Sequence, residues 1–348
     1  MESGKTIKIA MFGCGRIGRL HAKNILSGVY DGTPLVLTKV FDAVPEAVAA
    51  FKKDFNFENV AEKEEEILQD SAIDAILICT PTTHHARLIK AGLQNGKHVL
   101  CEKPAAISVE EADEVLAEHA KYPNLKLMIG FNRRFDESFL RMRERIQRGD
   151  IGEILNFSLT SRDRDECPES YVKTSGGIFK DMAIHDFDML RYILGSECNT
   201  VYAVGESRIQ DYFAKHSDVD TAVVTFTFQT ADKKNVFGTL NLCRKTSYGY
   251  DQRLEVFGKD GMLVSDNKRN NDVTLFSGTI ARDQEAQDFL FRYGTSYKSE
   301  LKIFAKAILE DTECSPSMND SKQALLLARA CEKALKEKRP VDMNELQQ

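Results

Sequence analysis

Three ionisable side chains recur at intervals of four and three residues in one apolar segment. Asp181, His185 and Asp188 stand at i, i+4 and i+7, so a helix over 179–194 would place them on one face. Burying such groups costs free energy unless they pair or take part in a reaction. Histidine titrates near neutrality and suits a general base, which a carboxylate one turn away can orient. The same spacing is also typical of a purely structural pair.

A glycine-rich turn near the N-terminus predicts a dinucleotide site. Gly13, Gly15 and Gly18 follow a β-branched, apolar run and open a helix-like segment. The first glycine permits the tight turn, the second lets a pyrophosphate approach the backbone, and the third allows close packing of helix and strand. The phosphates then face the helix N-terminus at Arg16 and Ile17. Glycine turns are common, but this strand–turn–helix context makes the signal strong.

A carboxylate at the end of the second predicted strand indicates which cofactor binds. Asp42 lies 24 residues after Gly18, where it can bind the ribose 2′-hydroxyl of NAD and repel the 2′-phosphate of NADP. Ala43 and Val44 offer no cation for that phosphate, and Arg16 can equally serve the pyrophosphate. The sequence therefore favours NAD over NADP. The alternative is that Asp42 only caps the next helix.

The rhythm of apolar segments predicts an α/β fold in two domains. Short strands alternate with amphipathic helices up to about residue 130, which is typical of a parallel, doubly wound Rossmann sheet. Its predicted strands are 7–12, 35–41, 73–79, 98–101 and 125–130, and its helices 16–27, 44–55, 86–95 and 109–122. We therefore expect a Rossmann domain over 1–130.

Beyond residue 131 the period changes to two, which predicts an α+β domain over 131–348 with a large, mainly antiparallel open sheet. The last predicted helix, 321–336, is the one that can pack back on the Rossmann domain. The predicted strands are 154–161, 201–209, 221–230, 235–243, 253–257 and 262–265. The predicted helices are 138–148, 179–194, 285–291, 297–310 and 321–336.

Composition excludes several classes of function. A net charge of −6 provides no basic surface for nucleic acid, and the longest apolar runs are too short to span a membrane. The eight cysteines are dispersed, without the spacing of a metal site, so we expect no metal. Free thiols inside apolar strands indicate a reducing compartment, and we expect a cytoplasmic protein.

Further motifs carry a resemblance to a known family. Two sets of residues occur in order along the chain: the stretch 80–85 with Glu102-Lys103-Pro104, and later Gly176-Gly177 with Asp181 and His185. They resemble the two signatures of the Gfo/Idh/MocA oxidoreductases. The resemblance covers nearly the whole chain. It implies that the following residues surround the nicotinamide of NAD: Thr80, Pro81, His85, Glu102 and Lys103.

Within the family, the chain most resembles the members that oxidise inositol, through segments 130–136, 161–163, 175–181, 184–188 and 248–253. This implies NAD-dependent oxidation of myo-inositol to 2-keto-myo-inositol. Segments 167–169 and 242–244 depart from the family pattern and leave the polyol open. Scyllo-inositol or an aldose is the alternative substrate. A non-catalytic dinucleotide-binding regulator is the other class, although Lys103 and His185 are both retained.

Roles in the reaction follow from this resemblance. His185 is expected to be the base, Lys103 to stabilise the developing alkoxide, and Asp181 to bind hydroxyl groups or orient the imidazole. The residues expected to bind substrate are Arg133, Asp163, Asp181, His185 and Tyr250.

Each assignment has a structural alternative. Lys103 can be a solvated lysine on the surface, and His85 can be a histidine that only begins a helix. Arg133 can pair with Asp136 on a loop, and Tyr250 can be a sheet-face tyrosine. We leave Asp188 outside the catalytic set, as a partner of His185 or of an arginine.

The predicted strands 222–228 and 237–242 carry apolar residues or threonine on both alternations. One sheet face then packs on helices, and the other is expected to pack on a second subunit. We expect a homo-oligomer, and the family resemblance implies a tetramer.

Overall fold

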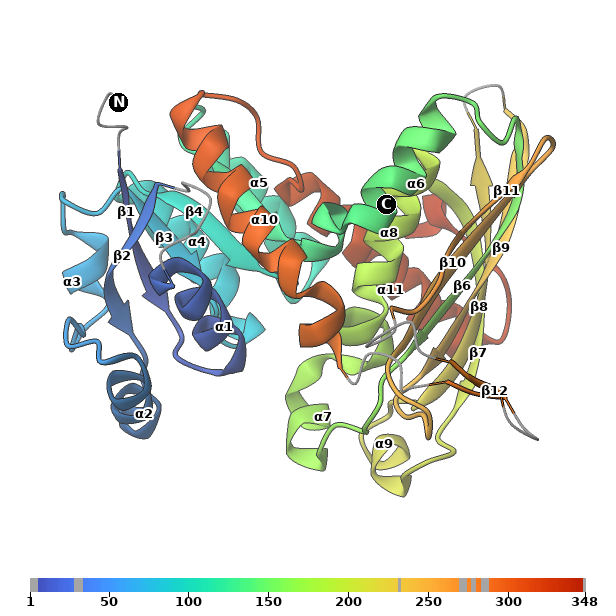
Figure 1. Cartoon of the computed structure of the whole chain (residues 1–348), viewed down its shortest axis with the longest axis horizontal. Helices are drawn as coiled ribbons and strands as arrows, with labels where there is room; N and C mark the ends of the chain where they lie inside the picture. Colours follow the sequence, from blue (N-terminus) through green and yellow to red (C-terminus); the bar gives the residue numbers. More distant parts are fainter. Residues whose placement is uncertain are drawn as a thin grey trace. The chain divides into compact units, whose positions relative to one another are not determined.

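A computed structural model describes residues 6–27, 34–230, 233–268, 274–276, 280–282 and 288–346. The chain forms two compact units, which we call the first and second unit (Figure 1). The first comprises Met1–Asn132 and Thr295–Lys322, and the second Arg133–Gly294 and Gln323–Gln348. The segment Thr295–Lys322 was predicted in the second domain. The structure places it in the first unit, whereas most of the last helix belongs to the second.

The first unit contains the predicted parallel Rossmann sheet. Its strand order is β2-β1-β3-β4-β5, and every adjacent pair is parallel. The strands are β1 (Ile7–Phe12), β2 (Leu35–Phe41), β3 (Ala75–Ile78), β4 (His98–Glu102) and β5 (Leu127–Gly130). The order reverses direction between β1 and β3. Ligands of such sheets bind beyond the carboxyl ends of the strands at this reversal, where the glycine turn also lies.

The helices of the first unit agree with the sequence prediction to within about a turn, apart from one short helix and one 3-10 turn that it missed. They are α1 (Arg16–Leu26), α2 (Pro45–Phe55), α4 (His85–Gln94) and α5 (Val109–His119). The missed elements are α3 (Glu65–Leu68) and the 3-10 turn η1 (Thr82–His84).

One long helix, α10 (Phe289–Leu309), replaces the two that the sequence predicted over 285–291 and 297–310. Residues 285–287 lie outside the described residues. The predicted break at Gly294 does not occur. The side chains of Arg292 and Tyr293 on one side and Ser296 on the other are buried, and this packing outweighs the low helix propensity of glycine.

The second unit is built on a seven-stranded sheet with the order β11-β10-β6-β9-β8-β7-β14. All neighbours are antiparallel except β6 and β9, so the sheet is mainly antiparallel, as predicted. The strands are β6 (Ile154–Arg162), β7 (Cys198–Glu206), β8 (Thr221–Gln229), β9 (Asn235–Cys243), β10 (Asp251–Gly258), β11 (Met262–Ser265) and β14 (Val341–Asp342). A separate hairpin joins β12 (Thr274–Phe276) to β13 (Ile280–Arg282).

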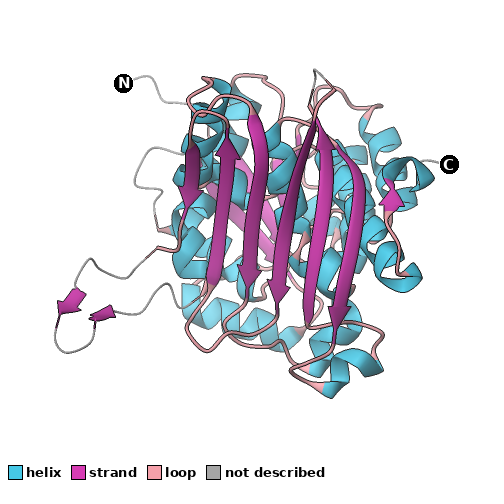
Figure 2. Cartoon of the chain, turned by 90° about the vertical axis from the view of Figure 1, so that its right-hand side faces the viewer, coloured by secondary structure: helices cyan, strands magenta, loops and turns pink. Residues whose placement is uncertain are grey.

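One face of this sheet packs on helices and the other does not. Rings of Phe157, Phe226 and Phe228 from the sheet form an aromatic cluster that Phe187 of α8 joins. Figure 2 shows the opposite face, with no helix in front of it. The remaining helices are α6 (Glu137–Gln147), α7 (Glu169–Ser175), α8 (Ile184–Leu194), α9 (Asp211–Lys215) and α11 (Met318–Glu337), with short turns η2 (Asn132–Phe135), η3 (Ile178–Met182) and η4 (Met343–Leu346).

All eight cysteines are free thiols. Among the helices of the described chain, none combines the length and apolar character needed to cross a membrane.

A close contact in this sheet generates a stability prediction. A Cβ on Gly238 would lie 2.2 Å from the ring of Phe157. We expect Gly238→Ala to lower the free energy of unfolding by about 1–3 kcal/mol through overpacking. The measurement is chemical denaturation, with Thr239→Ala as the control. In the double variant Gly238→Ala/Phe157→Leu the costs should be clearly less than additive. Additive costs, or an unchanged Gly238→Ala, would contradict the contact.

Candidate active site

The glycine turn has the geometry of a phosphate-binding loop. Gly13 has φ +98°, and a Cβ there would lie 2.5 Å from the carbonyl oxygen of Cys79 at the end of β3. A Cβ on Gly18 would lie 2.0 Å from the carbonyl oxygen of Gly13. At Gly15, by contrast, a Cβ would meet no described atom within 4 Å. Packing therefore requires two of the glycines, and the third borders open space that a ligand can use.

The start of α1 has amide groups available for an anion. Gly15 occupies the N-cap position, no described side chain caps the helix, and its first turn holds no acidic residue. Arg16 is exposed at the first helical position. The amides of the first helical turn and the positive end of the helix dipole suit a pyrophosphate. These residues fit the dinucleotide that the sequence predicts.

Asp42 lies beside this turn and holds it to the second strand. Its Oδ2 accepts a hydrogen bond from the Cys14 amide at 2.7 Å, and its Oδ1 accepts one from the Val44 amide at 2.9 Å. Burial, reinforced by the charge of Asp42, raises the pKa of the Cys14 thiol to about 12. The carboxylate therefore supports local backbone structure at the position predicted for ribose binding, and its role toward ribose stays a prediction.

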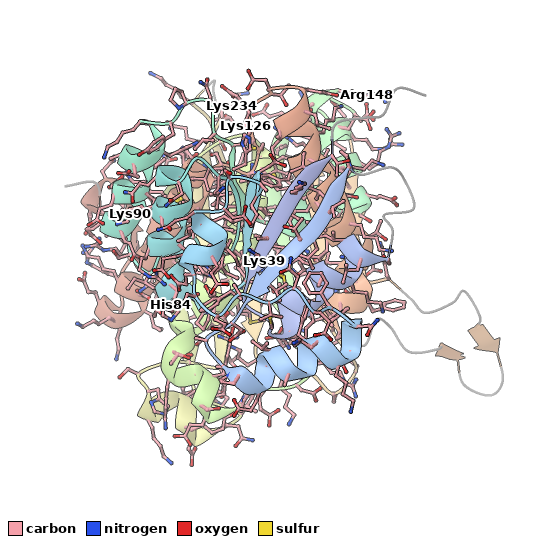
Figure 3. The ribbon with its side chains drawn as sticks, turned by 90° about the vertical axis from the view of Figure 1, so that its left-hand side faces the viewer. Lys39, His84, Lys90, Lys126, Arg148 and Lys234 are labelled. Atoms are coloured by element: carbon pink, nitrogen blue, oxygen red, sulfur yellow. The ribbon has the colours of Figure 1, made fainter. Side chains whose placement is uncertain are left out.

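His85 has a different environment from the one we expected. It is buried at the start of α4, with Nδ1 2.7 Å from the Pro104 carbonyl oxygen and Nε2 2.8 Å from that of Thr80. Burial lowers the pKa of His85. Because its ring nitrogens face these two backbone carbonyls, His85 joins the 80s loop to the loop after β4, and its contact with the cofactor stays a prediction. The neighbouring His84 is exposed (Figure 3).

The residues predicted to surround the nicotinamide lie at the carboxyl ends of β3 and β4. Ligands of open α/β sheets bind at this edge of the sheet. Thr80 follows β3, and its Oγ1 is buried with no hydrogen-bond partner among the described residues. Glu102 ends β4 and is buried, and Lys103 after it is half-buried. Pro81 is exposed before η1. A half-buried lysine at this edge differs from the fully solvated lysine of the structural alternative.

In the second unit, the segment that carries Asp181 and His185 is not one α-helix. Residues Ile178–Met182 form a π-helical turn, and α8 begins only at Ile184. The prediction of a continuous helix over 179–194 was therefore wrong, and the i, i+4 relation does not describe this pair. At the end of this turn the Ala183 amide donates to the Ile178 carbonyl oxygen at 2.9 Å, and at its start the Ile178 amide donates to Asp218 Oδ1 at 2.9 Å.

Asp181 is held by two residues that the sequence analysis did not select. The Tyr171 hydroxyl donates to its Oδ1 at 2.8 Å, and Arg244 Nη1 donates to its Oδ2 at 2.9 Å. The same Arg244 nitrogen lies 3.8 Å from Asp163. Burial raises the pKa of Asp163 to about 6, with Arg244 opposing the shift and Asp181 adding to it. Two predicted substrate-binding carboxylates are thus close together around one buried guanidinium.

Arg133 and Tyr250 belong to a second buried network. Arg133 forms a short ion pair with Asp186, and its Nη2 donates to the Tyr250 hydroxyl at 3.3 Å. That hydroxyl donates to Gln252 Oε1 at 3.2 Å, and Gln252 Nε2 donates to Asp186 at 2.9 Å. Burial raises the pKa of Asp186, although Arg133 opposes the shift. Arg133 does not pair with Asp136, which was the alternative that the sequence left open.

Asp188 pairs with an arginine, one of the two partners we considered. Arg134 Nε and Nη2 donate to its two carboxylate oxygens at 2.8 and 2.6 Å. Asp136 instead accepts from Arg292 Nη1 at 2.5 Å. Asp186 and Asp188 on α8 therefore bind consecutive arginines of η2, and His185 precedes both on the same helix.

Sequence reasoning missed five residues of these networks: Arg134, Tyr171, Asp186, Arg244 and Gln252. A signal existed for one of them. The two consecutive arginines at 133 and 134 and the two aspartates at 186 and 188 carry opposite charges. This pattern predicts that Asp186 has a partner. Arg244 lay within the departure from the family pattern, but nothing in its spacing indicated that it would reach Asp181.

The chain is similar to known protein families over both units. Residues 7–131 match the family described as "Oxidoreductase family, NAD-binding Rossmann fold", and residues 139–264 match the "GFO/IDH/MocA C-terminal domain".

Individual relatives cover nearly the whole chain. Myo-inositol 2-dehydrogenase of Thermotoga maritima is 38% identical over 98% of this chain and 99% of its own length. Inositol 2-dehydrogenase of Rhizobium meliloti is 37% identical over 97% of this chain and 99% of its own length. The crystal structure of scyllo-inositol dehydrogenase from Lactobacillus casei with bound NAD(H) and scyllo-inositol has a TM-score of 0.88 and 31% identity, covering 98% of this chain and all (100%) of that one.

The glycine turn generates a test that separates packing from ligand binding. We expect Gly15→Ala to keep the melting temperature and to weaken NAD⁺ binding about tenfold or more, because its Cβ occupies the open space beside the helix start. The control Gly18→Ala should lower both the melting temperature and the affinity. Calorimetric titration and thermal unfolding measure the two effects. Unchanged NAD⁺ affinity in Gly15→Ala would contradict this placement of the cofactor.

Proposed function

Because the chain belongs to the Gfo/Idh/MocA oxidoreductase family, we propose that it oxidises myo-inositol to 2-keto-myo-inositol with NAD. The observation that carries the proposal is 37–38% identity, over nearly the full chain, to relatives named as myo-inositol and inositol 2-dehydrogenases. The loop at Gly15 supports NAD as the cofactor, and Asp42 favours NAD over NADP by its negative charge.

Oxidising a secondary alcohol requires loss of the hydroxyl proton together with transfer of a hydride from the same carbon. Bound NAD accepts that hydride at its nicotinamide. We assign His185 as the base that takes the proton. Lys103 stabilises the charge that develops on the substrate oxygen, and its half-buried position strengthens this interaction relative to one in bulk water.

Asp181 binds substrate hydroxyls in this proposal. Both of its oxygens already accept hydrogen bonds, from Tyr171 and Arg244, so the carboxylate is held in one orientation and keeps further lone pairs for a ligand. Asp163, with a pKa of about 6, accepts hydrogen bonds from hydroxyls above that pH and donates one below it. A polyol needs such directional partners. Both arginines of these networks, Arg133 and Arg244, are paired with carboxylates, which disfavours an acidic substrate.

The reaction itself tests the proposal. With a panel of myo-inositol, scyllo-inositol and glucose, each offered with NAD⁺ and NADP⁺, we expect the highest kcat/KM for myo-inositol with NAD⁺. His185→Ala and Lys103→Met should each reduce it by about 100-fold or more, because each removes a group that acts in the transition state.

The control for these variants is His119→Ala, a partly exposed histidine at the end of α5 whose loss should leave the rate unchanged. A preference for scyllo-inositol or glucose would change the substrate and keep the mechanism. Undiminished turnover in His185→Ala or Lys103→Met would contradict the assigned roles. NAD⁺ binding without reduction by any polyol would favour a non-catalytic regulator.

The chain is also proposed to form a homotetramer through the uncovered face of its seven-stranded sheet (Figure 2). This face presents a row of exposed apolar side chains, which a monomer would leave in water. They include Val204, Val223, Phe237, Phe257 and Val264. Eight free thiols support a cytoplasmic location.

This association generates its own prediction. Phe237→Asp should shift the mass measured by light scattering from tetramer to a smaller species, because a carboxylate at the contact is costly to desolvate. Leu309→Asp replaces another exposed apolar side chain, at the end of α10, and should leave the mass unchanged. A monomeric wild-type chain would contradict the proposed tetramer.

A further inference from the structure

Three ionisable side chains meet in the interior of the first unit. His21 belongs to α1, Glu102 ends β4 and Glu300 lies on α10. His21 Nε2 is 2.7 Å from Glu102 Oε1 and 4.0 Å from Glu300 Oε2. The side chains of His21 and Glu300 are 1% and 0% exposed. Three distant segments of the chain therefore meet at one buried group of charges.

Glu300 is the unusual member of this cluster. Neither of its oxygens has a hydrogen-bond partner among the described residues, although both are fully buried. An ionised carboxylate in that position would be shielded from bulk solvent and would have no hydrogen-bond donor among the described residues, which is a costly arrangement in a protein interior. Burial, reinforced by the charge of Glu102, raises the pKa of Glu300 well above its usual range.

The groups around Glu300 also disfavour a second negative charge. His21 is the basic side chain in the cluster, and its ring stacks edge-on against Tyr297 of α10. Cys79, after β3, also interacts with both glutamates, and burial followed by their charges raises the pKa of its thiol. An imidazole can offset at most one carboxylate charge, so two ionised carboxylates would leave a net negative charge shielded from bulk solvent. A proton on one of them removes that imbalance.

We propose that Glu300 is held as a neutral carboxylic acid beneath Glu102, and that it is a positioning residue: together with His21 it fixes Glu102, and with it the start of the Lys103 loop, for the cofactor. This role rests on the proposed function. Gly130 supports it, because a Cβ there would lie 3.0 Å from Glu102 Oε2, so the carboxylate is confined on that side as well.

The variants Glu300→Gln and Glu300→Ala separate a neutral acid from an ionised one. Glutamine keeps the volume and a neutral, hydrogen-bonding head group, so we expect NAD⁺ affinity within about threefold of wild type at pH 7. Alanine leaves a cavity beside His21 and should weaken binding about tenfold or more. Glu310→Gln, at an exposed position on the same stretch of chain, is the matched control. Equal losses in glutamine and alanine variants would overturn the proposal.

A pH series on the apo protein provides a readout that does not depend on activity. A carboxyl group can have a higher pKa in the folded than in the unfolded state. Such a group lowers the stability of the protein as the pH rises from its unfolded-state pKa toward its folded-state pKa. The difference between the melting temperatures of Glu300→Gln and wild type should therefore shift in favour of the variant as the pH is raised from 5 to 9. For Glu310→Gln this difference should not change with pH. A constant difference would overturn the proposal.

Two further measurements complete the test. If the variants do not fold, ¹³C NMR titration of the glutamate carboxyls in wild type must show one that stays protonated at pH 7, and its absence would overturn the proposal. Stabilisation of wild type but not Glu300→Gln by Zn²⁺ or Mn²⁺ would also overturn it, because the cluster would then hold a cation. A protein that oxidises no polyol but shows the expected pH series would refute only the proposed function.

Discussion

Two buried arginine–aspartate pairs hold the helix that carries His185. Arg133 binds Asp186 and Arg134 binds Asp188, so consecutive residues of η2 hold alternate residues of α8. Removing one partner would leave an unpaired charge in the interior, which costs far more than the pair contributes. Because His185 directly precedes Asp186, this attachment fixes the helix position and direction from which the imidazole projects. Of the three side chains at positions 181, 185 and 188, His185 thus stays the candidate base and Asp181 a candidate substrate contact, while Asp188 is a structural anchor.

The first unit relies on backbone geometry where the second relies on charge. Gly13 and Gly18 are required because side chains there would collide with main-chain carbonyls, and this close packing leaves the helix start open at Gly15. Asp42 and His85 then tie neighbouring loops together through backbone groups. Several residues selected for cofactor binding therefore also hold the loops in which they lie. Rigid support of this kind is what precise placement of a cofactor requires.

Local patterns were sufficient for most elements and for the glycine turn. The strands of the first sheet follow from short apolar runs between amphipathic helices, and the change to period two near residue 130 follows from side-chain alternation. Long-range contacts explain what was missed. Asp218, which accepts a hydrogen bond from the Ile178 amide at the start of the π-helical turn, lies far along the chain, and Asp181 pairs with Arg244, which follows β9. The return of Thr295–Lys322 to the first unit likewise left no periodic signal.

The most direct test of the account follows the hydrogen that is transferred. The protein would be incubated with NAD⁺ and myo-inositol carrying deuterium on carbon 2, and both products examined by NMR and mass spectrometry. The account predicts that the deuterium moves to the nicotinamide ring of the reduced cofactor and that the sugar product is 2-keto-myo-inositol. Reduced cofactor without deuterium, or a ketone at another carbon, would contradict it.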